Sequence, residues 1–300
     1  MYNIDESNRE KHEYPTYGRQ FNTYKWFKPI ILAAVMGILY GLFAIVLLFT
    51  LMGDAESHGL SYTDLNFTDM RTTCYVLGTI VVAIPALFIA TKIVRDRPFS
   101  SYTSARGGWN RKIFGVGLLV AAVTTFLPSL YLTAKSAGLK PKNEITAVAL
   151  LVVLVLGSLQ CIAEEYVFRG VLMQTIGSWV KIPVIAVLLQ AAIFAFQHKY
   201  DVYGLLSVLI SGVGFGLVAW ITRGIEASCA LHIMNNVPTF YFIGAGLASV
   251  SGKANTITVI YNLCTYGVFV LVMLILRKKT HLFDEVKRDD LAQWNEKHNS

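Results

Sequence analysis

The stretch ITAVALLVVLVLGSLQCIAEEYVFRGVLMQTIG, residues 145–177, decides the fold class, because its apolar run is long enough to cross a lipid bilayer. The hydrocarbon core of a bilayer is about 30 Å thick and takes roughly 20 helical residues to cross. Strands of a membrane barrel alternate between apolar and polar residues, whereas this run is continuously apolar. Further apolar runs cover residues 29–52, 72–90, 113–133, 183–198, 204–222, 228–243 and 257–276. The sequence therefore predicts an all-α polytopic membrane bundle of about eight transmembrane helices.

The composition excludes two broad classes of protein. Hydrophobic residues make up 54% of the 300 residues, charged residues make up 15%, and the mean hydropathy is +0.51. A soluble chain carries about 25% charged residues, so a soluble enzyme and a disordered chain are both excluded. The net charge is +7, but the basic residues form no cluster beside a soluble fold that could bind nucleic acid. We therefore expect a lipid bilayer, and no nucleic acid, as a partner.

The distribution of basic residues predicts the topology. An even number of spans places both termini on one side of the membrane. Twenty of the 26 Lys and Arg residues fall on the two tails and on the connections that share their side. The positive-inside rule makes that side cytoplasmic. We expect a cytoplasmic N-terminal tail (1–28), a membrane-embedded bundle (29–276) and a cytoplasmic C-terminal tail (277–300). The C-terminal tail is expected either to form a short surface helix or to stay solvated and partly frayed.

Ionisable residues inside the apolar runs are the strongest functional signal. A charge at the centre of a bilayer costs roughly 2.5 to 3.5 kcal/mol even on insertion scales, so such residues usually face a polar interior and serve a function. This chain has five of them, together with a nearby asparagine: Glu164, Glu165, Arg169, His198, His232 and Asn236. So many costly groups predict one shared cavity.

In the segment CIAEEYVFRG (161–170), only one of the two acidic residues is predicted to have a partner on the same helix. On a continuous helix Glu165 and Arg169 are four residues apart and can form an ion pair. Glu164 is rotated by about 100° from Glu165 and has no partner within its own helix. An unpaired carboxylate in a site of low dielectric gains proton affinity, which suits a general base near neutral pH. The alternative is an ordinary charged helix end at the cytoplasmic surface.

The two histidines also have structural explanations. His198 follows Phe194 by one turn, and a histidine at the end of a helix often serves as a cap. His232 and Asn236 share one helical face. This pair either joins two membrane helices or supplies hydrogen bonds to a developing oxyanion.

The order and spacing of three motifs, EExxxR, FxxxH and HxxxN, resemble those of one family. It is the CAAX prenyl protease and bacteriocin-processing family (CPBP, or Abi) of intramembrane glutamate endopeptidases, and the resemblance covers residues 157–238. The resemblance implies that Glu164 activates a water molecule and that His198 holds and polarises it. It also implies that His232 and Asn236 stabilise the oxyanion, while Glu165 and Arg169 fix the helix and the local field.

The implied reaction is peptide hydrolysis by water, without a covalent intermediate and without a cofactor. The substrate would be a membrane-associated peptide or a lipidated protein, and the active site would lie towards the cytoplasmic side of a bacterial plasma membrane. The chain contains no GxSxG and no HExxH motif. Three alternatives remain open: a zinc site formed by Glu164, His198 and His232, a non-catalytic scaffold or bacteriocin-immunity protein, and a proton-coupled transporter.

The glycines at 212 and 216 form a GxxxG face that permits close approach of another helix. We expect this face to pack against the helix that carries Glu164 or His232. A groove for the substrate, lined by small residues, is the alternative.

Overall fold

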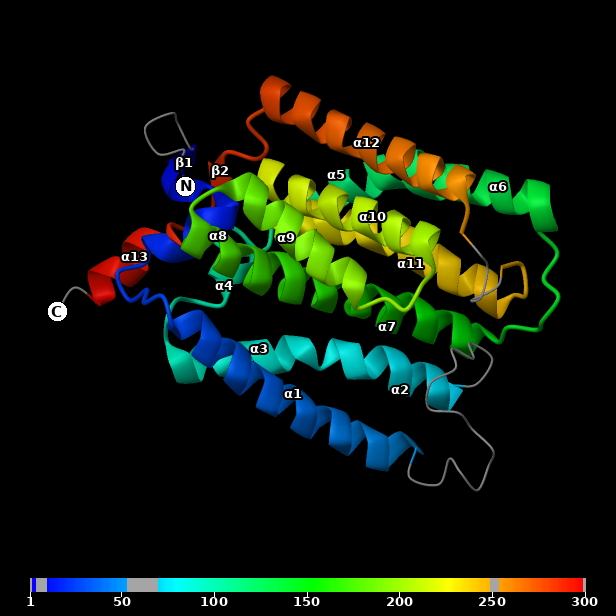
Figure 1. Cartoon of the computed structure of the whole chain (residues 1–300), viewed down its shortest axis with the longest axis horizontal. Helices are drawn as coiled ribbons and strands as arrows, with labels where there is room; N and C mark the ends of the chain where they lie inside the picture. Colours follow the sequence, from blue (N-terminus) through cyan, green and yellow to red (C-terminus); the bar gives the residue numbers. More distant parts are fainter. Residues whose placement is uncertain (1, 4–9, 53–69, 249–253, 299–300) are drawn as a thin grey trace.

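A computed structural model describes residues 2–3, 10–52, 70–248 and 254–298. The helices of the membrane-embedded part lie side by side as a bundle (Figure 1). They are α1 (Lys28–Met52), α2 (Met70–Val81), α3 (Ala83–Val94), α5 (Arg111–Ala121), α6 (Leu127–Ala137), α7 (Ala147–Glu165), α8 (Gln174–Val180), α9 (Pro183–Phe196), α10 (Val202–Ile221), α11 (Glu226–Gly244) and α12 (Thr256–Lys279). The all-α polytopic fold is confirmed.

Each of the eight predicted runs is helical, but not all are equally suited to crossing a membrane. Among the described residues, six segments are long and apolar enough: Lys28–Leu51, Met70–Val94, Arg111–Ala137, Ala147–Val180, Val202–Ile221 and Thr256–Lys279. Helix α9 is apolar but shorter. The six qualifying segments do not include α11, which carries His232 and Asn236. The number of complete crossings therefore remains a prediction.

The helix that carries the acidic motif is continuous but not uniform. Helices α7 and α8 are joined by the π-helical stretch η6 (Tyr166–Met173), and a second π-helical stretch, η5 (Ala122–Phe126), joins α5 to α6. The combined segment Ala147–Val180 has 34 residues. At about 1.5 Å per residue it is roughly 50 Å long, so it must extend beyond a hydrocarbon core of about 30 Å. π-Helical turns are frequent at functional sites.

Both tails pack against the same end of the bundle (Figure 1). The N-terminal tail forms η2 (Glu10–His12) and η3 (Tyr14–Gln20), and the C-terminal tail forms α13 (Asp290–Lys297). The strands β1 (Tyr2–Asn3) and β2 (Glu285–Val286) pair antiparallel and join the two tails. Of the two forms left open for the C-terminal tail, the short helix is the one present.

The physical reason for this docking is aromatic burial. Tyr14, Tyr17 and Phe21 are at most 2% exposed, which removes a large apolar area from water. Trp294 Nε1 donates to Thr23 Oγ1 at 2.8 Å, so the two tails also bind each other. The short helix α4 (Ser100–Thr103) underlies them, because Tyr14 Oη donates to the carbonyl oxygen of Tyr102 at 2.5 Å.

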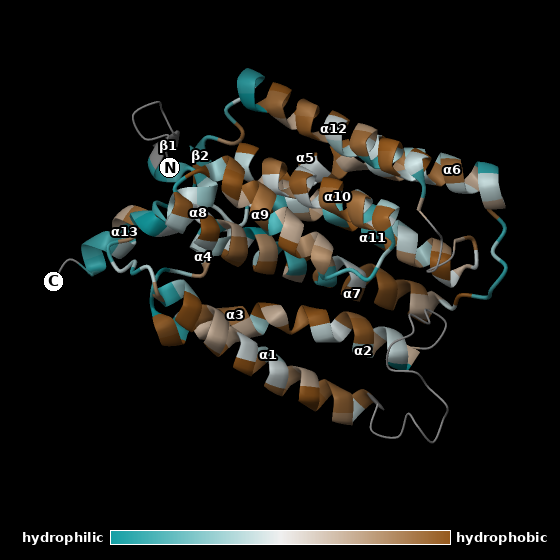
Figure 2. Ribbon diagram, in the orientation of Figure 1, coloured by the Kyte–Doolittle hydropathy of each residue, from teal (hydrophilic) through white to brown (hydrophobic). Residues whose placement is uncertain are grey.

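The surface hydropathy matches a membrane-embedded body with polar ends. Figure 2 shows hydrophobic residues along the long helices and hydrophilic residues around α13 and the two strands. Helix α1 is the most peripheral of the predicted spans, with Ile38 66% and Phe49 72% exposed. Its apolar exposed side is the surface expected of a helix that faces lipid.

The GxxxG face of α10 packs against α9 rather than against the helix that carries Glu164 or His232. A Cβ atom added to Gly212 would lie 3.1 Å from Ala191, and one added to Gly216 would lie 2.6 Å from Gln190. The expected partner is therefore wrong. The short helix α9 is the neighbour that can approach closely, because small and polar residues face α10.

Candidate active site

The Glu165 carboxylate lies at the centre of the polar cluster and is completely buried. Its Oε1 atom accepts from Arg169 Nη1 at 3.0 Å, which confirms the ion pair expected from their spacing. The same oxygen lies 2.9 Å from His232 Nδ1. The Ser228 hydroxyl donates to the other oxygen, Oε2. Glu165 therefore joins α7 to α11 as well as stabilising its own helix.

The Arg169 side chain is also fully buried, so its charge needs compensation from several directions. Besides the ion pair, Arg169 Nη2 donates to the carbonyl oxygen of Gly212 at 3.3 Å. The guanidinium carbon lies 4.7 Å from the ring centre of Phe194 and 5.0 Å from that of Phe215. Cation–π contacts of this kind are strongest when water is excluded.

The His232 imidazole lies between the two acidic residues. While Nδ1 faces Glu165, Nε2 is 3.5 Å from Glu164 Oε2 and 3.1 Å from Asn236 Nδ2. The Phe215 ring stacks on the imidazole, with ring centres 4.6 Å apart and planes inclined by 19°. This packing holds the ring plane, and the contact with Glu165 favours a proton on Nδ1. The face of His232 towards Glu164 is thus fixed.

The amide of Asn236 is oriented by its neighbour. Asn235 Nδ2 donates to Asn236 Oδ1 at 2.9 Å, which leaves the Asn236 amino group directed at His232 Nε2. The shared helical face of His232 and Asn236 is therefore the arrangement in the structure.

His198 is held apart from this cluster. Its Nδ1 atom is 2.9 Å from the carbonyl oxygen of Phe194, and its ring stacks on Tyr200 with centres 5.7 Å apart. Within the described residues no hydrogen bond or ion pair joins His198 to Glu164. The Phe194 ring lies between the two imidazoles, 5.0 Å from His198 and 6.3 Å from His232. The structure thus joins four of the six expected residues by hydrogen bonds, brings Glu164 within 3.5 Å of His232, and leaves His198 one aromatic ring away.

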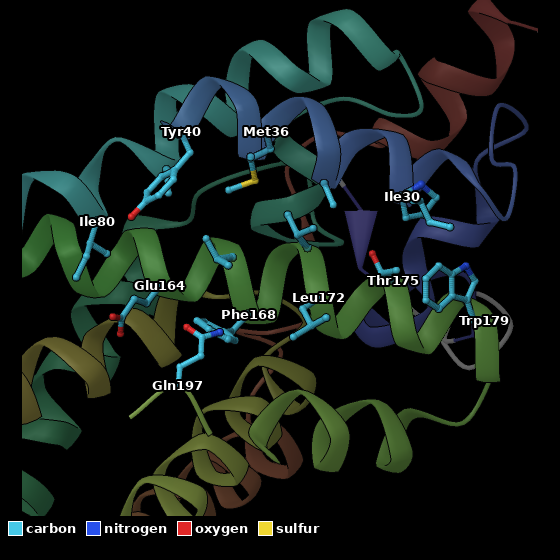
Figure 3. Close-up of a pocket in the computed structure, with 16 residues that line it drawn as sticks. Ile30, Met36, Tyr40, Ile80, Glu164, Phe168, Leu172, Thr175, Trp179 and Gln197 are labelled. Atoms are coloured by element: carbon cyan, nitrogen blue, oxygen red, sulfur yellow. The ribbon is translucent and has the colours of Figure 1, made fainter. Parts of the chain in front are cut away.

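The Glu164 side chain is 18% exposed and reaches the end of an apolar groove of about 680 Å³. The groove runs between α1 and the α7–α8 helix (Figure 3). Figure 3 shows Glu164 and Ile80 at one end and Trp179 and Ile30 at the other, with Gln197 beside Phe168 near Glu164. The charged residue thus has access to a space that an apolar molecule can enter.

The described residues hold no group of three or more His, Cys, Asp and Glu side chains with the spacing of metal ligands. Glu164 and His232 are close, but His198 does not complete a set with them. The proposed zinc site therefore has no preformed set of ligands here.

The comparison with known families concerns the same part of the chain. The model of the type II CAAX prenyl endopeptidase Rce1-like family matches residues 146–238, from the start of α7 into α11. This range contains all six residues expected in the site. We call residues 146–238 the Rce1-like segment because of this similarity.

One curated relative extends the likeness beyond the Rce1-like segment. The uncharacterized protein YyaK of Bacillus subtilis (strain 168) is 28% identical over 173 residues, which are 54% of this chain and 58% of YyaK. The chain thus matches little more than half of that relative's length. No solved structure matches the chain.

Three residues of the Rce1-like segment were missed by the reasoning from sequence. Ser228 lies four residues before His232, so its place on the same helical face was a usable signal. Phe215 gave no signal beyond its position in a glycine-rich helix. Gln197 was overlooked because its neighbour His198 carries the motif, yet Gln197 is the one that lines the groove with Glu164.

Proposed function

We propose that this chain is an intramembrane endopeptidase that hydrolyses a peptide bond of a membrane-associated peptide or lipidated protein, with Glu164 activating the attacking water. The observation that carries the proposal is the 3.5 Å contact between Glu164 and His232 Nε2 at the end of an apolar groove. A water nucleophile needs a base within hydrogen-bond reach, and a carboxylate beside an apolar space provides one. The match of residues 146–238 to an endopeptidase family supports the same reaction class.

In the proposed reaction the Glu164 carboxylate takes a proton from water while the oxygen attacks the scissile carbonyl carbon. The tetrahedral intermediate then carries negative charge on the former carbonyl oxygen. The Asn236 amide N–H stabilises this charge, and His232 does so in the form that carries a proton on Nε2 as well as on Nδ1. Breakdown of the intermediate returns the proton from Glu164 to the leaving amine. No bond forms between the protein and the substrate.

His198 takes a less direct role than the histidine on α11. Among the described residues no direct hydrogen bond joins it to Glu164, so we assign it a contact through the attacking water. Glu165, Arg169 and Ser228 act as positioning residues, because they hold His232 and do not reach the groove.

We place the site towards the cytoplasmic face of a bacterial plasma membrane. Three arginines in the connections lie against the two tails: the Arg106 carbonyl oxygen accepts from the Lys287 N–H, Arg223 Nη1 donates to the His12 carbonyl oxygen, and Arg97 lies beside Gly18. The positive-inside rule supports a cytoplasmic assignment for the end of the bundle that carries the tails. The Bacillus relative supports a bacterial host.

The test is a comparison of membrane-protein fragments and small peptides in cells that make the wild type, Glu164→Gln, His198→Ala or Glu144→Gln. The last variant is the matched control, because Glu144 is an exposed carboxylate in the connection before α7. We expect fragments that require Glu164 and His198 but not Glu144. The same fragments in wild type and Glu164→Gln would reject proteolysis and would favour a scaffold. A chelator added to the purified protein tests metal dependence, and we expect no effect.

A further inference from the structure

The groove beside Glu164 lies between α1 and the α7–α8 helix, which run in opposite directions (Figure 3). On α1 the lining residues recur at helical spacing, as Ile30, Ala33, Gly37 and Tyr40, and the facing wall belongs to α7, η6 and α8. Ile30, Ala33 and Gly37 are exposed residues, so this side of the groove opens laterally towards the bilayer. A molecule dissolved in the membrane can therefore reach Glu164 without crossing the polar end of the bundle.

Three polar groups in the groove have no hydrogen bond within the described part of the chain. They are the Tyr40 hydroxyl, the Thr175 hydroxyl and the Gln197 amide, and all three line the same space. Figure 3 shows Tyr40 and Gln197 on either side of the Glu164 end, with Thr175 further along towards Trp179. Tyr40 and Gln197 are exposed and Thr175 is half-buried, so all three side chains can pair with a molecule that enters the groove.

This pairing distinguishes a peptide from a lipid chain. An acyl or isoprenoid chain would fill the volume but would leave the hydroxyls and the amide without partners. The main chain of an extended peptide presents an N–H or a C=O group at every residue. Gln197 can both donate and accept, and a hydroxyl can do either, so the three groups suit a peptide main chain.

The length of the groove sets the size of the occupant. From Glu164 to Trp179 is 15 residues along the helix, or roughly 22 Å at about 1.5 Å per residue. An extended peptide covers about 3.3 Å per residue, so roughly six or seven residues fit. The groove is lined by no charged side chain other than Glu164 among the described residues.

We infer that this groove binds an extended, uncharged and apolar stretch of about six residues of the substrate polypeptide, through main-chain hydrogen bonds to Tyr40, Thr175 and Gln197. The inference rests on the proposed function for its choice of a polypeptide substrate. It assigns Gln197 as a positioning residue next to the base and makes α1 one wall of the substrate site. Substrate side chains, rather than a lipid anchor, would then occupy the space towards Trp179.

Binding can be tested without turnover by using the Glu164→Gln variant in lipid nanodiscs. The probe is a fluorescent, uncharged hexapeptide of alternating leucine and alanine with both ends blocked. The control probe has the same side chains, but its peptide nitrogens are methylated. We expect the first probe to bind about tenfold more tightly or better, because methylation removes the main-chain donors.

The three polar groups provide the second half of the test. The combined substitutions Tyr40→Phe, Thr175→Val and Gln197→Leu should remove most of the preference for the unmethylated probe. The control combination Tyr131→Phe and Thr133→Val lies on α6, away from the groove, and should keep it. Equal binding of the two probes, or displacement of the peptide by a fatty acyl amide of equal length, would overturn the inference in favour of a lipid groove.

A steric test uses two glycines of α1. A Cβ atom at either Gly37 or Gly41 would meet nothing within 4 Å, so the first carbon of a larger side chain is accommodated at both positions. Only Gly37 lines the groove. We expect Gly37→Leu to weaken binding of the hexapeptide about tenfold or more and Gly41→Leu to leave it unchanged. The same affinity for both variants would contradict the assignment. If the peptide binds as described but the wild type cleaves nothing, the proposed function fails while this site stands.

Discussion

His232 Nδ1 lies 2.9 Å from Glu165 Oε1, and this contact joins the two helices that carry the proposed chemistry. Because Glu165 is also held by Arg169 and Ser228, its position is over-determined. The hydrogen bond to this fixed carboxylate restrains the His232 imidazole, so Nε2 faces Glu164. The second acidic residue of the motif thus works through His232 as well as through its own helix.

Substitution of Glu165 should damage both stability and catalysis. Glu165→Gln leaves the buried Arg169 charge without its partner, and breaking a buried ion pair from one side costs about 3–5 kcal/mol. We expect a clearly lower thermal unfolding midpoint for the protein in detergent. An unchanged midpoint would show that Arg169 is compensated elsewhere.

Ser228→Ala should lower stability less than Glu165→Gln does. It removes one hydrogen bond to a charged acceptor, which is worth about 1.5–3 kcal/mol. If Ser228 only supports the fold, the pH dependence of cleavage should keep its shape. If it tunes the Glu165–His232 pair, as we expect, the pH profile should shift while Ser228→Thr, which retains a hydroxyl, restores it. Identical profiles for Ser228→Ala and wild type would count against a positioning role.

A second buried ion pair, Arg106 with Glu226, should contribute to stability without contacting the residues of the proposed reaction. Arg106 Nη2 donates to both carboxylate oxygens of Glu226, at 2.9 and 2.8 Å, and both side chains are at most 1% exposed. We expect Arg106→Met or Glu226→Gln alone to cost about 3–5 kcal/mol in the free energy of unfolding. The double substitution should cost less than the sum, because it leaves no unpaired charge. Strict additivity in chemical unfolding would refute this coupling.

The docking of the N-terminal tail should depend on pH through His12. Burial lowers the pKa of this ring below its ordinary value of 6.5, and its hydrogen bond with the Ala105 carbonyl offsets the burial only in part. The undocked ring therefore binds protons more readily than the docked ring. The contribution of His12 to docking is complete above about pH 6.5 and is lost as the pH falls below that value.

Limited proteolysis of the tail provides the measurement. In the wild type we expect cleavage around residues 14–20 to increase as the pH falls from about 7.5 to about 5.5. His12→Gln, which retains a donor for the Ala105 carbonyl but does not titrate, should flatten this dependence. A steep dependence in His12→Gln would assign the effect to another group.

The sequence predicted contacts within a helix better than contacts between helices. Glu165 with Arg169, and His232 with Asn236, are each four residues apart, so helical geometry alone brings them together. The approach of Glu165 to Ser228 and His232 depends on how α7 packs against α11, and no spacing within one helix encodes it.

The remaining differences have the same origin. The GxxxG face of α10 was recognised, but its partner α9 is selected by Gly212 meeting Ala191 rather than by the motif. The spacing of apolar residues left the C-terminal tail open between a short helix and a solvated form, and the burial of Tyr14 and Tyr17 in the N-terminal tail depends on a surface provided by distant helices. His198 was expected beside Glu164, and the end of α9 directs Gln197 to the groove instead.

The most direct measurement of the central claim uses purified protein in lipid nanodiscs, a library of uncharged apolar peptides and water enriched in the heavy isotope of oxygen. Mass spectrometry then reports which peptide bonds break and whether the new carboxylate carries the heavy oxygen. We expect labelled products from the wild type and a loss of about 10²–10⁴-fold in their rate of formation with Glu164→Gln, the usual contribution of a general base. Labelled products formed by Glu164→Gln at the wild-type rate would contradict the assignment of Glu164 as the residue that activates water.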